Sequence, residues 1–284
     1  MSAPILTAEN IWGLPRTELL AVCPSAGAKQ AHKSRSPNFG FVSSENLLDE
    51  LETIGFYPTF VVQGRTKLVD RRPFTKHIIR LRAEHYLGLE TDVPDIVFTN
   101  NSDGTGAYTL FFGYIRYICG NMLIFGDYRT MLRIPHRKNI VERVVEGTLQ
   151  LARMSGQIIE EINIMKQIQL SREEQLLLAE HALMARFGWE QEDTEEANGP
   201  DLRLLPTVYT AEDFLTPRRP QDEGDPSLWM TYQLLEENAT KGGVEREDAS
   251  GKRHVTRRIK SPSGMVNTES LLYSLTKRFM ELKS

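Results

Sequence analysis

The spacing of apolar residues changes once along this chain, and that change constrains its fold more than any other feature. Between residues 57 and 126, apolar residues form short runs and alternating patterns separated by turn residues, which favours β-strands. From Asn139 to Leu170 they recur at helical spacing. We therefore predict an α+β protein with an N-terminal antiparallel sheet region followed by a helical half.

Four strands are predicted: one beginning at Phe60, and others over 76–82, 95–99 and 107–119. The segment 100–104 combines Asn, Ser, Asp and Gly, which favours a turn between the last two. A helix over 44–54 precedes them, with Ser43 or Ser44 as its cap and Gly55 as its stop.

The helical half begins with residues 139–170, as one helix or as two joined near Ser155 and Gly156. Ser171 and Glu174 form a capping-box pattern that opens a helix ending at Phe187. A short helix starts after Ser227 and extends to about Leu235, residues 241–264 form a loop or hairpin, and a terminal helix starts at Asn267.

These patterns predict four parts: an irregular segment 1–40, an α+β core domain 41–188, an acidic linker or excursion 189–226, and C-terminal helices over 227–284 that enclose the basic loop or hairpin of residues 241–264. The 284 residues suffice for a full hydrophobic core. No apolar run is long enough to span a bilayer, and no secretory signal is visible. Two cysteines, Cys23 and Cys119, fit a reducing compartment, so we expect a cytoplasmic protein.

Charge is segregated although the net charge is only −4. Residues 65–85 hold seven Lys/Arg against two acids, 127–138 hold four against one, and 252–260 hold five against none. Residues 189–226 hold eleven Asp/Glu against three Arg. Because a local positive potential attracts a polyanion and releases its counterions, nucleic acid is the leading partner class.

We predict that these basic segments contact phosphates, those of 133–138 with the amides of a helix start. The candidate nucleic-acid-binding residues are Arg65, Lys67, Arg71, Arg72, Lys76, His77, Arg80, Arg82, Arg133, His136, Arg137, Lys138, Lys252, Arg253, Arg257, Arg258 and Lys260. The alternatives are edge-strand protection for 65–82, a solvated loop for 133–138, and pairing with the acidic segment for 252–260.

No phosphate-binding glycine loop, zinc-protease motif or paired-cysteine motif occurs, so we assign no catalytic residue, metal or cofactor. The histidines are isolated from other ligand residues, which does not favour metal binding. A nuclease could be assembled only from Asp95, Asp103 and the terminal residues 281–283.

Several stretches together resemble a phage- and plasmid-associated family known as domain of unknown function 932. They include Cys23-Pro24-Ser25-Ala26, residues 72–82, 93–98 and 101–108, Arg133-Ile134-Pro135-His136, Glu236-Glu237-Asn238 and Lys241-Gly242-Gly243. The resemblance covers nearly the whole chain. It implies mobile-element biology but brings no catalytic residues.

The order of sheet then helices is also loosely like that of single-strand annealing proteins, which is an analogy of fold only. The leading hypothesis is a phage or plasmid protein that binds nucleic acid, with single-stranded DNA favoured. It would promote annealing in recombination or replication without covalent chemistry, and a homo-oligomer is plausible. The alternatives are an anti-defence protein that binds a host enzyme through its acidic surface, and a metal-dependent nuclease.

Overall fold

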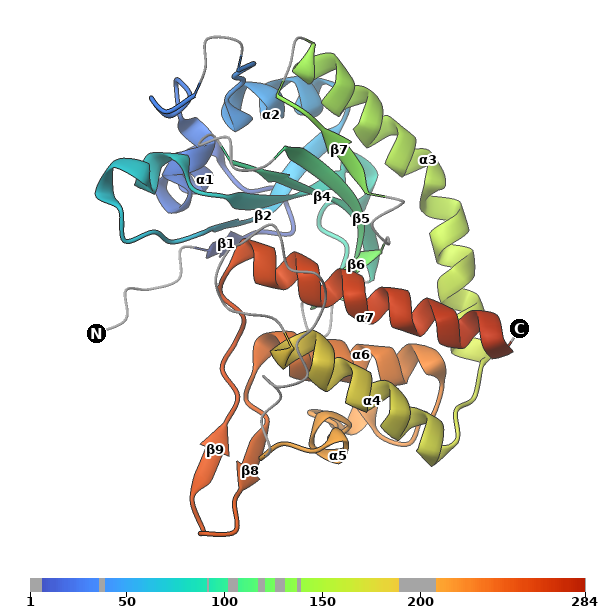
Figure 1. Cartoon of the computed structure of the whole chain (residues 1–284). Helices are drawn as coiled ribbons and strands as arrows, with labels where there is room; N and C mark the ends of the chain where they lie inside the picture. The colour runs from blue at the N-terminus through green and yellow to red at the C-terminus, as the bar shows by residue number, and fades with distance from the viewer. Residues whose placement is uncertain are drawn as a thin grey trace. The chain divides into compact units, whose positions relative to one another are not determined.

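A computed structural model describes residues 7–35, 39–90, 92–101, 107–116, 121–125, 131–136, 139–188 and 208–283. The chain divides into two compact units (Figure 1). The first comprises residues 1–155 and 260–262, and the second comprises 156–259 and 263–284. The predicted α+β order, with an antiparallel sheet first and helices after it, is confirmed.

The first unit is built on a seven-stranded sheet in which every strand pair is antiparallel. Strands β1 to β6 lie side by side in sequence order, and β7 pairs with β5 (Figure 1). The strands are β1 (Thr7–Glu9), β2 (Phe56–Gln63), β3 (His77–Ala83), β4 (Val93–Asn100), β5 (Tyr108–Arg116), β6 (Asn121–Phe125) and β7 (Leu132–Ile134). The single strand predicted over 107–119 therefore ends at Arg116, with 117–120 outside the described residues.

Helices α1 (Arg16–Val22) and α2 (Ser44–Thr53) precede the central strands, and α3 (Ile140–Gln167) follows them. The predicted cap of α2 is confirmed, since the Ser43 hydroxyl accepts a hydrogen bond from the Asn46 amide at 3.1 Å. Ser44 attaches α2 to the sheet, because its hydroxyl accepts a 2.9 Å hydrogen bond from the Asn100 side chain and also contacts His77 Nε2 at 2.8 Å. Helix α3 is continuous through Ser155 and Gly156, where the two compact units divide.

Strand β3 is a central strand, which excludes the alternative of edge-strand protection for its basic residues. It lies between β2 and β4, and every residue from His77 to Arg82 is buried. Arg80 and Arg82 alternate with Ile79 and Leu81, so the two guanidinium groups share one face of the sheet.

A buried charge network holds these two arginines. Arg82 donates two hydrogen bonds to the Asp95 carboxylate, at 2.8 and 3.0 Å, and Arg80 Nε lies 3.1 Å from Asp95 Oδ2. Arg80 also pairs with Glu9 and lies over the Phe60 ring, 5.0 Å from its centroid. Because two cations meet two carboxylates here, the network leaves no net charge for a polyanion.

We expect Asp95→Asn to lower the free energy of unfolding by about 3–5 kcal/mol, because it leaves two buried guanidinium groups without their shared carboxylate. Urea denaturation of the full chain measures this. Asp49→Asn is the matched control, since Asp49 pairs with Arg16 at 2.9 Å at the surface and its loss costs about 0–1 kcal/mol. Equal losses in the free energy of unfolding for both variants would show that the buried network contributes no more than a surface ion pair.

The second unit contains the end of α3, then α4 (Arg172–Phe187), α5 (Ala211–Phe214), α6 (Leu228–Lys241), the strands β8 (Glu245–Glu247) and β9 (Arg253–Val255), and α7 (Pro262–Lys283). The capping box of α4 is confirmed, with Ser171 N donating to Glu174 Oε2 at 2.8 Å and Glu174 N to Ser171 Oγ at 3.3 Å. Helix α6 continues beyond Leu235, and α7 begins before Asn267.

The described half of the expected acidic linker is packed into the second unit. Arg219 pairs with Glu237 of α6 at 2.5 Å and with Asp222 at 2.9 Å. The Asn238 side chain donates to the carbonyl of Phe214 at 2.8 Å. Residues 208–226 are therefore structural, whereas residues 189–207 lie outside the described residues. No helix in the described residues has both the length and the apolar character needed to cross a bilayer.

Helix α6 is buried before Lys241 except at the half-buried Met230, and the carboxyl group of Glu236 on α6 is paired with that of Glu269 on α7. Glu236 and Glu269 are each only 2% exposed and share a hydrogen bond. Thr240 donates a further hydrogen bond to Glu236 at 3.0 Å. Burial raises the pKa of Glu236, because the charged form loses its hydration.

A pKa raised in the folded state stabilises the fold at low pH, and this stabilisation is lost as the pH rises through the folded-state pKa. We therefore expect Glu236→Gln, which stays neutral, to gain stability relative to the wild type as the pH rises from about 4.3, the ordinary pKa of a glutamate, to neutral pH. Thermal unfolding of both proteins across this range measures the difference. Glu247→Gln, at an exposed residue of β8, is the control and should show no such trend. A stability difference between the two proteins that does not change with pH would contradict a raised pKa of Glu236.

Candidate nucleic-acid interface

The connection between β2 and β3, residues 64–76, carries three exposed cations, Arg65, Lys67 and Arg72. We call it the basic loop. Gly64 closes its base, with its amide donating to the carbonyl of Lys76 at 2.7 Å. A Cβ on Gly64 would lie 2.9 Å from that same carbonyl oxygen, so only glycine fits without displacement.

The basic loop is anchored at several points. A short 3-10 helix, Val69–Phe74, forms part of it. The carbonyl of Arg72 accepts hydrogen bonds from Gln63 Nε2 at 3.2 Å and from Thr75 Oγ1 at 3.3 Å. The rings of His32 and Phe74 pack in a T-shaped arrangement, with their centroids 5.3 Å apart. These contacts give the loop a defined conformation.

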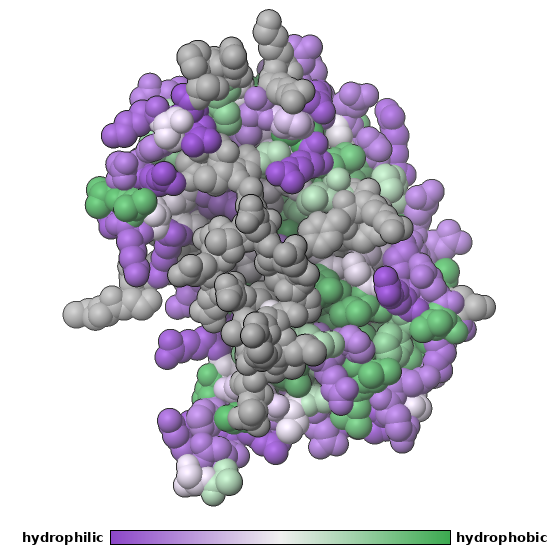
Figure 2. Space-filling view, in the orientation of Figure 1, coloured by the Kyte–Doolittle hydropathy of each residue, from purple (hydrophilic) through white to green (hydrophobic). Residues whose placement is uncertain are grey.

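The cations of this loop lack the partners that neutralise Arg80 and Arg82. Arg65, Lys67 and Arg72 are exposed and Arg71 is partly exposed. Within the described part of the chain, no carboxylate lies within 4 Å of the charged nitrogens of these four residues. Figure 2 shows hydrophilic residues bordering a small hydrophobic patch at the left, where Figure 1 draws this connection. Four unpaired charges on an anchored loop produce a local positive potential.

We expect Gly64→Ala to disturb the base of this loop and to lower the free energy of unfolding by roughly 1–3 kcal/mol, because the added methyl group meets backbone. Chemical denaturation measures the loss. The control is Gly156→Ala in α3, where nothing lies within 4 Å of the added carbon and alanine favours the helix. A loss from Gly156→Ala as large as that from Gly64→Ala would argue against this steric account.

Three candidate residues from the same stretch are corrected. His77, Arg80 and Arg82 are at most 1% exposed, so their side chains are not available to a phosphate backbone. His77 is hydrogen-bonded to Ser25 Oγ at 2.9 Å and Ser44 Oγ at 2.8 Å. Burial lowers its pKa to about 4, and it is therefore neutral at neutral pH. Lys76 is half-buried and already has an interaction partner.

The candidate residues before α3 divide into two kinds. Arg133, on β7, is exposed. His136 stacks on Phe39 with ring centroids 4.3 Å apart, lies 4.5 Å from the ring of Tyr108, and has Nδ1 3.3 Å from the carbonyl oxygen of Gly40. It therefore has a packing role. Arg137 and Lys138 lie outside the described residues, so the anion site expected there stays a prediction.

The basic segment 252–260 includes one strand of a hairpin, which we call the basic hairpin (residues 245–260). Strand β9 pairs with β8, and Arg253 forms an ion pair with Glu245. His254 Nε2 lies 2.7 Å from Asp248 Oδ2. Lys252, Arg257, Arg258 and Lys260 are exposed and have no such carboxylate partner within the described ranges. The acidic residues of 245–248 were the available signal that part of this charge is neutralised locally.

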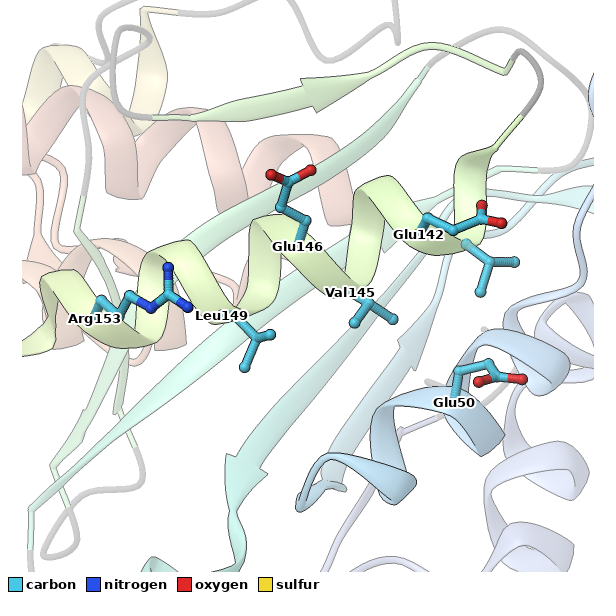
Figure 3. A pocket seen from close by; sticks show the side chains of 7 residues that line it. Glu50, Glu142, Val145, Glu146, Leu149 and Arg153 are labelled. Carbon is cyan, nitrogen blue, oxygen red and sulfur yellow. The ribbon is translucent and has the colours of Figure 1, made fainter.

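A groove between α2 and α3 has the wrong sign for a phosphate. Its volume is about 420 Å³, and Val145 and Leu149 lie along its α3 side. Glu50 comes from α2, and Glu142, Glu146 and Arg153 come from α3 (Figure 3). Three carboxylates against one cation repel a polyanion, so the basic loop is the better candidate site.

Residues assigned to the other hypotheses are also placed. The nuclease alternative needs Asp95 and Asp103. The Asp95 carboxylate forms ion pairs with Arg80 and Arg82, and Asp103 lies outside the described residues. No group of three His, Cys, Asp or Glu residues that could hold a metal occurs among the residues described. The basic loop and Arg133 belong to the first unit and the basic hairpin mainly to the second, so their union into one track stays a prediction.

Comparison with known proteins identifies relatives along nearly the whole chain. The UPF0380 proteins YafZ and YfjQ of Escherichia coli strain K12 are each 33% identical to it over 267 residues, which covers 94% of this chain and 92% of each relative. No solved structure matches. The family model described as domain of unknown function (DUF932) matches residues 31–261. The expected resemblance is thus confirmed, and the chain belongs to the DUF932 family.

Proposed function

We propose that this protein binds nucleic acid, with single-stranded DNA favoured, and promotes strand annealing in recombination or replication of a mobile element without covalent chemistry. One observation carries the proposal: Arg65, Lys67, Arg71 and Arg72 lie on one anchored loop without carboxylate partners in the described part of the chain. A cation that is already paired with a carboxylate displaces few counterions from a nucleic acid. An unpaired cation can neutralise a phosphate with its full charge and release the counterion held there.

The basic hairpin is the second proposed contact. Its exposed Lys252, Arg257, Arg258 and Lys260 follow or precede a strand whose own arginine is paired with Glu245. The proposed phosphate-binding set therefore differs from the sequence-based one. It comprises Arg65, Lys67, Arg71, Arg72, Arg133, Lys252, Arg257, Arg258 and Lys260.

No described contact favours the anti-defence alternative. The carboxylates of Asp213, Asp222 and Glu237 are engaged by Arg246 and Arg219 within the second unit. These acids are therefore used to hold the fold and are not arranged as a free anionic surface.

We expect the affinity for a single-stranded oligonucleotide to fall steeply with salt and Arg71→Ala/Arg72→Ala to flatten that slope. Each lost phosphate contact should reduce the slope of log affinity against log salt by about 0.7. Fluorescence anisotropy at several salt concentrations measures this. The same variant should also slow the annealing of complementary labelled strands.

The matched control is Arg143→Ala/Arg278→Ala, which removes two exposed cations from α3 and α7 and should leave the slope unchanged. Absent binding at low salt, or binding that is insensitive to salt, would reject the proposed function. Weakened binding of the loop variant together with unchanged annealing would restrict the proposal to binding, and normal binding of that variant would reject the basic loop as the site.

A further inference from the structure

The basic loop exposes two adjacent aliphatic side chains among its cations. Leu68 is 55% exposed and Val69 is 69% exposed. Of the large hydrophobic residues that are exposed in the described part of the chain, these two are the only neighbours in sequence. An exposed apolar pair of this kind marks a contact surface more often than a single exposed residue does.

The loop backbone holds this pair at the surface. The amide of Leu68 donates to Thr66 Oγ1 at 3.2 Å, and its carbonyl accepts from the Arg71 amide at 3.2 Å. Val69 begins the 3-10 helix, whose end is bound to Gln63 and Thr75 through the carbonyl of Arg72. These hydrogen bonds fix the backbone from which the two exposed side chains extend.

The cations lie on both sides of the pair. Arg65 and Lys67 precede it and Arg71 and Arg72 follow it, and Asp70 between them lies 3.6 Å from His32 Nε2. A ligand that fits this loop must therefore supply anionic groups around an accessible apolar surface. Nucleic acid supplies both where its bases are unstacked, because phosphates then flank exposed base faces.

We propose that Leu68 and Val69 insert between unstacked bases while the flanking cations contact the adjacent phosphates. This inference rests on the proposed function and deepens it, since it names the feature that selects single strands. In a duplex the bases are stacked, so insertion there must first overcome an unstacking cost of about a few kcal/mol per step, and phosphate contacts dominate binding.

The test uses the full chain with Leu68→Ser/Val69→Ser and with Leu68→Trp. We expect the serine variant to bind a single-stranded oligonucleotide roughly tenfold more weakly, to bind duplex unchanged, and to keep the wild-type salt slope. The tryptophan variant should bind single strands at least as tightly as the wild type, because an indole stacks on bases. Leu89→Ser/Leu177→Ser, which alters exposed leucines elsewhere, is the matched control.

The outcomes separate this inference from the proposed function. Salt-dependent binding that Arg71→Ala/Arg72→Ala weakens but Leu68→Ser/Val69→Ser does not would overturn the inference and leave the proposed function intact. Equal losses on single strands and duplex would overturn it as well. If Leu68→Ser/Val69→Ser lost binding only to vesicles that contain anionic lipid, the pair would contact a membrane surface and the inference would be overturned. No binding of the wild type to any oligonucleotide would overturn both proposals.

Discussion

The first unit depends on the ion pairs that the Asp95 carboxylate forms with both Arg80 and Arg82. Asp95 lies on β4 and holds Arg80 and Arg82 of β3, so it compensates the charge that the strand brings into the sheet. An uncompensated buried guanidinium costs several kcal/mol, and a central strand that contains two of them requires such a partner. With β3 fixed between β2 and β4, the basic loop leaves the sheet from a rigid base at Gly64 and Lys76.

Arginine therefore has two roles within residues 65–82. Arg80 and Arg82 are neutralised inside the sheet, whereas Arg71 and Arg72 extend from the loop without carboxylate partners in the described residues. The basic hairpin repeats this contrast, since Arg253 is paired across the strands and Arg257 and Arg258 are exposed. Charge density along the sequence thus overstates the charge that a ligand can contact.

Much of the fold could be predicted from local signals. The caps at Ser43 and Ser171 depend on residues three positions apart, and the helical period after Asn139 is a property of one segment. The site was less predictable. Whether β3 is an edge strand or a central strand depends on pairing with β4, and the carboxylate that neutralises its arginines is thirteen residues away from Arg82. Leu68 and Val69 gave no pattern of their own, because their exposure follows from the hydrogen bonds of the loop.

The sequence by itself determined the order of sheet and helices, the main helix starts, the segregation of charge and the family to which the chain belongs. Periodicity and capping depend on residues a few positions apart, so they can be recognised in the sequence alone. The tertiary structure alone decided which cations are buried and which are exposed, because ion pairing and burial depend on side chains that pairing of distant strands brings together. For this protein that distinction narrows the candidate interface within residues 65–82 to the basic loop that precedes β3.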